Sequence, residues 1–261
     1  KVAFIVPITS ALVGTNGSLN LENRPLVDDG MMYVDDAWGG IYKIDVSSGH
    51  NGEVVWFADS EMSKDENPRS RGIAMWGNAV YKDLVDGRVV AVDRDSGEFL
   101  WDLQIARVDH PDSAGINIPK EGFTSAPLAV EGRILVGQSW GDRATRGWLG
   151  SLDAATGEEQ WRWYAVPGPG VPGHETWLDD HNAWKTGGAG MWTTGSYDVA
   201  QRLTIWGTGQ PVPMFDPEYR PGDNLFTNAA VAVDIDEGTL QWHFQYTPNE
   251  SWDYDENGVH I

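Results

Sequence analysis

Two aspartates near the end of the chain, Asp253 and Asp255, have a type and spacing that suit chemistry. If the segment around them is extended, side chains two positions apart point to the same face, so both carboxylates can reach one ligand. Two like charges held this close need a cation, a shared proton or full solvation. The alternative is an acidic turn in solvent. The pair alone leaves both interpretations open.

The charge balance narrows the classes of partner. The 261 residues include 39 Asp and Glu against 18 Lys and Arg, a formal net charge of -21. This balance argues against nucleic acid or an anionic membrane surface as a partner. The sequence has no cysteine, which removes disulfides, thiolate metal sites and thiol catalysis. Small neutral substrates, cations and basic proteins remain possible ligands.

The elements that must position these aspartates are predicted to be short strands. The chain has 14 Trp, 31 Gly and 14 Pro, which is typical of strands joined by tight turns. No segment keeps an apolar period of 3.6 residues for three turns, so an all-β protein is predicted. The apolar run at residues 2–13 is too short to cross a bilayer. We interpret it as a first strand rather than a signal segment, because no small-residue cleavage site follows.

One pattern recurs: a small residue, an apolar residue, Asp, a few residues with Gly, then Trp. It occupies residues 91–101, 151–161 and 232–242, with a looser copy at 43–56. Each copy predicts a hairpin whose Gly supplies a positive φ. Further strand pairs, such as that at residues 126–136, precede most copies. Four strands per repeat predict β-propeller blades with the Trp packed between neighbours, and these blades end near Trp56, Trp101, Trp161 and Trp242.

This repeat resembles the blades of the PQQ-dependent alcohol dehydrogenases, quinoproteins built on an eight-bladed propeller. The resemblance extends from about residue 12 to residue 261 and implies one partial propeller domain over residues 1–261, with about four of the expected eight blades. A half ring would leave open sheet edges. We therefore expect the N-terminal half of a longer enzyme, completed by a missing segment or by another chain. A closed four-bladed ring is the alternative.

Loops between the repeats resemble the cofactor and metal site of the family. Residues 137–147 are similar to a segment that contacts the quinone and supplies a metal-binding Glu, for which this chain has Asp142. Residues 184–192 resemble the stretch whose last Trp is the floor for the quinone, although Trp is often a core residue. The cofactor-binding residues implied by these two segments are Ser139, Trp140, Gly141 and Trp192.

Four further residues match family positions. Gln210 stands where an Asn amide oxygen is a metal ligand. Glu22 and Arg71 occupy quinone-contacting positions, where Arg71 would stabilise negative charge on the reduced ring; the alternative is exposed loop charges. Thr124 aligns with a hydroxyl that binds a cofactor carboxylate. Many relatives carry two adjacent cysteines ahead of the Arg, where this chain has Asp65 and Glu66.

Residues 247–255 resemble the segment that supplies the catalytic base, which assigns that role to Asp253. Asp255 matches the extra carboxylate of lanthanide-dependent members. The implied metal ligands all bind through oxygen, which suits Ca²⁺ or a lanthanide, with three carboxylates favouring the lanthanide; they are Asp142, Gln210, Asp253 and Asp255.

The resemblance implies oxidation of a small alcohol to an aldehyde by hydride transfer to PQQ. Asp253 would be the general base, with Arg71 assisting. It further implies a cytochrome or quinone as electron acceptor, and a periplasmic location with the leader already removed. The competing interpretation is a non-catalytic propeller that serves as a binding scaffold, as in the outer-membrane assembly lipoproteins with similar blades.

Overall fold

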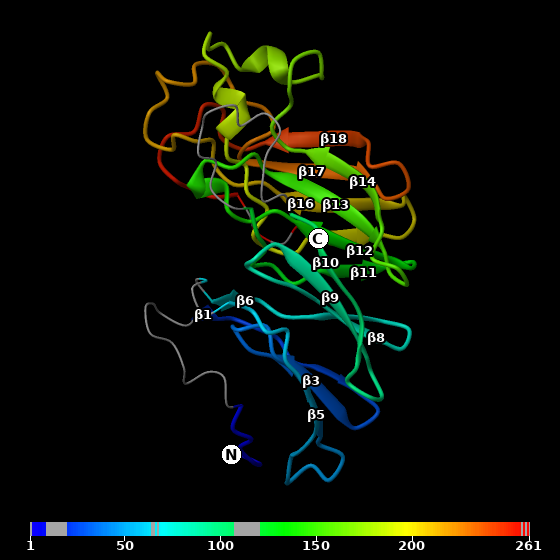
Figure 1. Ribbon diagram of the computed structural model, residues 1–261. Helices are drawn as coiled ribbons and strands as arrows, with labels where there is room; N and C mark the ends of the chain where they lie inside the picture. Colours follow the sequence, from blue (N-terminus) through cyan, green and yellow to red (C-terminus); the bar gives the residue numbers. More distant parts are fainter. Residues whose placement is uncertain are drawn as a thin grey trace.

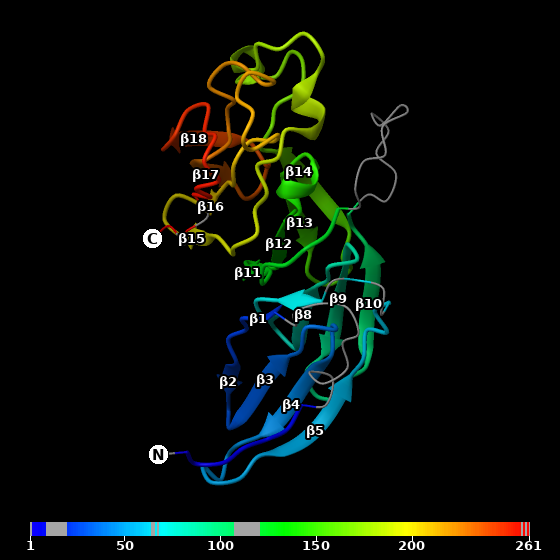
Figure 2. The same cartoon turned by 90° about the vertical axis from the view of Figure 1, so that its left-hand side faces the viewer.

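The computed structural model describes residues 2–8, 20–63, 66, 68–106, 121–256, 258 and 260. Its framework is four antiparallel sheets of four strands each, which follow one another in chain order (Figures 1 and 2). Within each sheet every strand pairs with its neighbour in the sequence. This arrangement confirms the prediction of an all-β chain built from four-stranded propeller blades.

The strands of the four blades have the following bounds. The first blade contains β2 (Leu26–Asp28), β3 (Met31–Asp35), β4 (Ile41–Asp45) and β5 (Glu53–Ala58). The second contains β7 (Ala74–Trp76), β8 (Ala79–Asp83), β9 (Arg88–Asp93) and β10 (Phe99–Gln104). The third contains β11 (Leu128–Val130), β12 (Arg133–Gly137), β13 (Trp148–Asp153) and β14 (Glu159–Tyr164). The fourth contains β15 (Ser196–Asp198), β16 (Leu203–Gly207), β17 (Ala229–Asp234) and β18 (Leu240–Gln245).

Short elements lie between the blades. A parallel pair joins β1 (Asn20–Leu21) to β6 (Arg69–Ser70). Single 3-10 turns form at η2 (Gly141–Arg143), η3 (His174–Thr176) and η4 (Ala183–Thr186). None of the helices in the described ranges has the length and apolar character needed to cross a membrane.

The hairpin between the third and fourth strands of each blade is stabilised by its aspartate. In the third blade, Asp153 Oδ1 accepts the backbone N–H groups of Ala155 and Thr156, each at 2.9 Å. These bonds lower the pKa of Asp153, the backbone bond from Thr156 most. Gly157 then takes a φ of +73°, which glycine adopts without a Cβ penalty. The Asp and Gly of the repeat therefore determine the shape of the turn.

The tryptophan of each of the first three repeats joins one blade to the next. The indole N–H of Trp56 donates to the carbonyl oxygen of Arg94 at 3.1 Å, and that of Trp101 donates to Ala154 at 3.2 Å. A Cβ added to Gly157 would lie 3.0 Å from the ring of Trp101. The predicted packing of the repeat Trp between blades is confirmed for the first three blades. On the fourth blade, Trp242 is 43% exposed.

The prediction of a first strand over residues 2–13 is wrong for the part that the structure describes. Residues 2–8 belong to no strand, and Pro7 has no N–H to donate to a sheet. Val6 and Ile8 pack instead against the first blade, on the cluster of Val34, Tyr42 and Ile44. The apolar character of this segment thus reflects packing without strand pairing. Residues 9–13 lie outside the described residues.

Candidate cofactor and metal site

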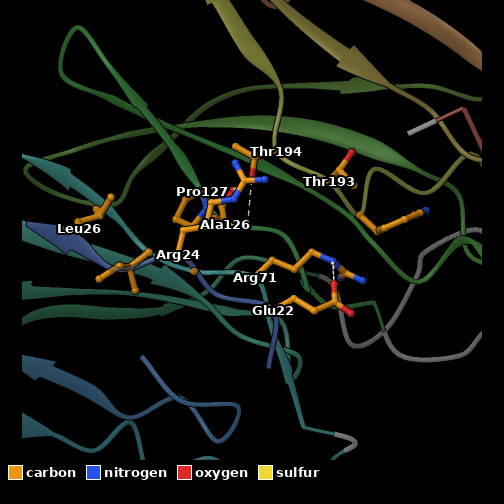
Figure 3. Close-up of a pocket in the computed structure, with 11 residues that line it drawn as sticks. Glu22, Arg24, Leu26, Arg71, Ala126, Pro127, Thr193 and Thr194 are labelled. Carbon is orange, nitrogen blue, oxygen red and sulfur yellow. Dashed lines mark hydrogen bonds and ion pairs between the residues drawn. The ribbon is translucent and has the colours of Figure 1, made fainter. Parts of the chain in front are cut away.

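Arg71 joins three loops that the sequence analysis identified separately. It follows β6, and its Nη1 donates to Thr124 Oγ1 at 2.8 Å. Its Nε lies 2.9 Å from a carboxylate oxygen of Glu22, the pair drawn in Figure 3. Burial lowers the pKa of Arg71, while Glu22 acts in the opposite direction; an arginine remains charged at neutral pH. The half-buried guanidinium can thus present a positive charge to an anionic ligand.

Trp192 lies against this cluster and connects it to the acidic segment. Its ring centroid is 4.7 Å from Arg71 Cζ, which is within cation–π range. Its Nε1 donates to Asp255 Oδ1 at 3.2 Å. A pocket of about 190 Å³ gathers these groups and is lined by Arg69, Arg71, Thr124, Ser139, Trp140, Asp142, Trp192 and Asp255. Seven of these eight residues, all except Arg69, are predicted site residues, and they include both aromatic candidates.

A second pocket, of about 450 Å³, adjoins the first and is lined by Glu22, Arg71 and Trp192 among others (Figure 3). Arg71 and Trp192 line both pockets, so they form the wall between them. Cationic donors beside a flat aromatic surface fit a planar, anionic cofactor such as PQQ.

The segment around Ser139 is held at close range to its neighbours. Ser139 Oγ accepts the backbone N–H of Thr124 at 2.9 Å. A Cβ on Gly141 would lie 2.6 Å from the backbone nitrogen of Gly190, so a side chain there would collide with the next loop. Trp140 is buried in a cluster of the first two blades, and Arg143 Cζ lies 3.9 Å from its ring centroid. All three predicted residues thus lie at the pocket or directly beside it.

Gln210 and Asp142 form the polar pair expected for a metal site. Gln210 is 2% exposed, and its Nε2 donates to Asp142 Oδ1 at 2.6 Å. Its Oε1 is buried without a hydrogen-bond partner among the described residues. A buried acceptor left unpaired is costly. An amide oxygen in this condition, beside a carboxylate, fits a hard cation.

The acidic segment departs from the extended conformation considered for it. Asp253 and Asp255 have φ values of 65° and 52°, in the left-handed region, and neither lies in a strand. The two carboxylates therefore do not share a face as neighbours on a strand would. Asp255 reaches Trp192, whereas the pKa of Asp253 is raised by burial first and then by the charges of Asp142 and Glu250.

The described residues contain no group of three or more His, Cys, Asp or Glu side chains that could hold a metal ion. Three of the four predicted ligands act on one another: Gln210 donates a hydrogen bond to Asp142, and the charge of Asp142 raises the pKa of Asp253. The fourth, Asp255, accepts the indole N–H of Trp192. The residue types fit a hard cation. The complete ligand set stays a prediction.

Residues that the sequence analysis missed lie at the site or beneath it. Arg69 lines the smaller pocket, with its Cζ 5.7 Å from the ring centroid of Trp140; its position two residues before Arg71 is the available signal. Lys82 and Asp83 are buried below the Arg71 loop. A Lys-Asp pair inside the otherwise apolar stretch of β8 could have drawn attention to them.

Comparisons with known proteins bear on the family of this chain. Residues 9–258 match the family model described as PQQ, the β-propeller domain of glucose, ethanol and alcohol dehydrogenases. The quinoprotein alcohol dehydrogenase PedH of Pseudomonas putida is 31% identical over 271 residues, which cover 95% of this chain and 43% of PedH. The quinohemoprotein alcohol dehydrogenase ADH IIB of Pseudomonas putida is 34% identical, over 90% of this chain and 35% of its own length.

Solved structures show the same architecture. A europium-containing methanol dehydrogenase superposes with a TM-score of 0.80 at 29% identity, covering 94% of this chain and 45% of that one. The quinohemoprotein alcohol dehydrogenase of Comamonas testosteroni has a TM-score of 0.80 at 30% identity, covering 93% of this chain and 37% of that one. The chain thus spans less than half the length of each of these relatives.

Proposed function

Because the chain belongs to the PQQ-dependent β-propeller family of glucose, ethanol and alcohol dehydrogenases, we propose that it carries part of a PQQ site for the oxidation of an alcohol to an aldehyde. The observation that carries this proposal is the meeting of Arg71, Thr124, Trp192 and Asp255 at one pocket. These residues come from four separate loops. A chain that used the propeller only as a scaffold would have no need to bring them together.

The residues at the pocket can bind and orient the cofactor. The indole of Trp192 offers a flat surface for stacking, and Arg71 and Thr124 offer hydrogen-bond donors to carbonyl or carboxylate oxygens. Glu22 holds the Arg71 Nε at 2.9 Å, which orients the guanidinium. When bound, PQQ would supply the acceptor for the two electrons that the alcohol loses.

Asp253 is the proposed general base. Its side chain is exposed toward solvent, so a substrate hydroxyl can approach it. Partial burial and the charges of Asp142 and Glu250 raise its pKa, which brings its proton affinity closer to that required of a base near neutral pH. The carboxylate would take the hydroxyl proton of the alcohol, while Arg71 would stabilise negative charge at the pocket.

The proposed cation ligands are Asp142, Gln210, Asp253 and Asp255. The unpaired Oε1 of Gln210 and its bond to Asp142 support this assignment. A lanthanide is the preferred ion because three carboxylates match a trivalent charge, and Ca²⁺ is the alternative. Bound there, the cation would act as a Lewis acid.

The exposed Trp242 supports the proposal that further blades complete the propeller. In the first three blades the equivalent Trp donates to a carbonyl of the following blade. We infer that a fifth blade, from a further segment or another chain, covers Trp242. A cytochrome or quinone as electron acceptor, and a periplasmic location, are proposals that rest on the family.

The test adds PQQ to the intact protein with Ca²⁺ or La³⁺. We expect saturable PQQ binding that requires one of the two metals, and alcohol-dependent reduction of an electron-accepting dye with primary alcohols. The control is the same protein with metal but no PQQ. Absence of PQQ binding with either metal would defeat the proposal and favour a binding scaffold.

A further inference from the structure

Strand β8 carries two buried charges of opposite sign beneath the pocket, Lys82 and Asp83, which are 1% and 3% exposed. We propose that these are positioning residues, which hold Arg71 and Thr124 in the geometry that binds the cofactor. The inference rests on the proposed function. It assigns no direct contact with cofactor or substrate to either residue.

Lys82 fixes the loop that bears Arg71. Its Nζ lies 2.5 Å from Asp35 Oδ2 on β3 and donates to Ser70 Oγ at 2.7 Å. Ser70 immediately precedes Arg71, and its Oγ also accepts the backbone N–H of Gly72 at 3.2 Å. The hydroxyl of Ser70 thus contacts the chain on both sides of Arg71. Lys82 and Asp35 together hold that hydroxyl in place.

Asp83 fixes the loop that bears Thr124. Side chains that are adjacent on a strand point to opposite faces, so Asp83 faces away from Lys82. Its Oδ2 accepts the hydroxyl of Ser125 at 3.1 Å. Ser125 follows Thr124, whose backbone N–H is held by Ser139. The two neighbouring charges of β8 therefore hold two different loops.

The two loops meet again above the strand, where Arg71 Nη1 donates to Thr124 Oγ1 at 2.8 Å. The contacts form a closed circuit from Lys82 through Ser70 and Arg71 to Thr124, then through Ser125 back to Asp83. Buried charges are weak contributors to stability compared with apolar residues of the same size. Their hydrogen bonds do, however, specify one arrangement of the groups that they contact.

Electrostatics makes this circuit sensitive to pH. Burial raises the pKa of Asp83 to about 7, although Lys82 and the Ser125 hydroxyl oppose the rise. The charged groups that act on it from the described elements packed around it are Lys82 on the same strand, Asp35 on β3 and Arg71 after β6. The charged form of Asp83 accepts the Ser125 hydroxyl more strongly than the neutral form. The Thr124 loop should therefore be held more firmly above pH 7 than below it.

The test compares PQQ affinity of the intact protein between pH 6 and pH 8, measured by quenching of tryptophan fluorescence. We expect native affinity to rise by about threefold to tenfold across this range, as a charge-assisted bond replaces a neutral one. Asp83→Asn should remove the rise. Asp86→Asn is the matched control, because Asp86 is a buried acid of the same hairpin that pairs with Arg88. This control should keep the rise.

The variant Ser125→Ala distinguishes the positioning of the Thr124 loop from a direct effect of the Asp83 charge on the ligand. It leaves Asp83 in place but removes its contact with the Thr124 loop, so we expect about tenfold weaker PQQ binding at pH 8 and a smaller rise with pH. Affinity that falls above pH 7 would overturn the proposal, since Asp83 would then act only by repelling an anionic ligand. A rise that persists unchanged in Asp83→Asn would overturn it too.

A readout without PQQ distinguishes this inference from the proposed function. The NMR signal of the Arg71 side-chain Nε–H, assigned with Arg71→Lys, should shift near pH 7 in the native protein and in Asp86→Asn, but not in Asp83→Asn. If this shift occurs while PQQ fails to bind, the positioning role is supported and the proposed function is contradicted. If PQQ binds but the pH-dependent shift of the Arg71 signal is the same in Asp83→Asn as in the native protein, the positioning role is wrong and the proposed function is unaffected.

Discussion

The indole Nε1 of Trp161 donates a hydrogen bond of 2.8 Å to the carbonyl oxygen of Ile235, in the turn of the next blade. The ring covers Gly238 in that turn, where an added Cβ would lie 2.5 Å from it. The earlier blades repeat this contact. Each turn thus forms a surface for the tryptophan of the blade before it, and only glycine leaves room for the ring.

This contact predicts a difference between two glycines at equivalent turns. Gly157→Ala should destabilise the protein by about 1–3 kcal/mol more than Gly49→Ala, because its Cβ would be forced against the Trp101 ring. Both glycines have a positive φ, but a Cβ on Gly49 would meet nothing within 4 Å. Chemical denaturation of the two variants measures the difference. Equal losses of stability would mean that backbone strain alone explains why the turn requires glycine at this position.

A second prediction concerns the proposed base. Asp253→Asn should lower turnover at least about a hundredfold, as expected for loss of general-base catalysis, while PQQ binding stays within a few-fold. Dye reduction and fluorescence quenching measure the two effects separately. Asp180→Asn, which alters a fully exposed carboxylate, serves as the control. Alcohol-dependent turnover at the native rate in Asp253→Asn would remove the assignment.

A third prediction concerns Asp255. Asp255→Ala should abolish La³⁺-supported activity while retaining activity with Ca²⁺, because the trivalent ion needs the additional negative charge. The substitution also removes the acceptor for Trp192 Nε1. Trp192→Phe provides the comparison, since it removes that N–H and keeps the carboxylate. Equal loss with both metals in Asp255→Ala would contradict the metal preference.

A fourth prediction concerns stability in acid. The pKa of Asp153 is lowered in the folded state, chiefly by the backbone bond from Thr156. This group therefore contributes stability above its unfolded pKa of about 4, and the contribution is lost as the pH falls through the folded pKa. Asp153→Asn should flatten part of the fall in melting temperature as the pH drops below about 4. A slope identical to that of the native protein would show that Asp153 does not contribute.

Much of the fold could be predicted because its determinants are local and repeated. The spacing of Asp153, Gly157 and Trp161 specifies a turn, a positive φ and a bulged fourth strand within nine residues. The same spacing in other blades indicates the repeat. Residues 2–8 could not be assigned in this way, because an apolar stretch can pack on a sheet without joining it.

The candidate site was predictable where a loop motif carries its residues, and unpredictable where the geometry depends on tertiary contacts. Arg71, Thr124 and Trp192 were found from motifs and do meet at one pocket. The positive φ of Asp253 and Asp255 depends on packing that spacing does not encode. Lys82 and Asp83 lie in one strand, and only the folded chain shows that they serve two different loops.

The contact between each tryptophan and the following turn gives a row of blades a direction. The described blades have an uncovered turn at Gly49 and an uncovered indole at Trp242. Surfaces of these two kinds are complementary rather than identical, so an association through them is head-to-tail and not two-fold symmetric. Such contacts end in a closed ring when the rotation per blade permits it, and continue as an open array when it does not. The indole that lies on a glycine turn at each contact between blades therefore contributes to whether the blades close into a ring.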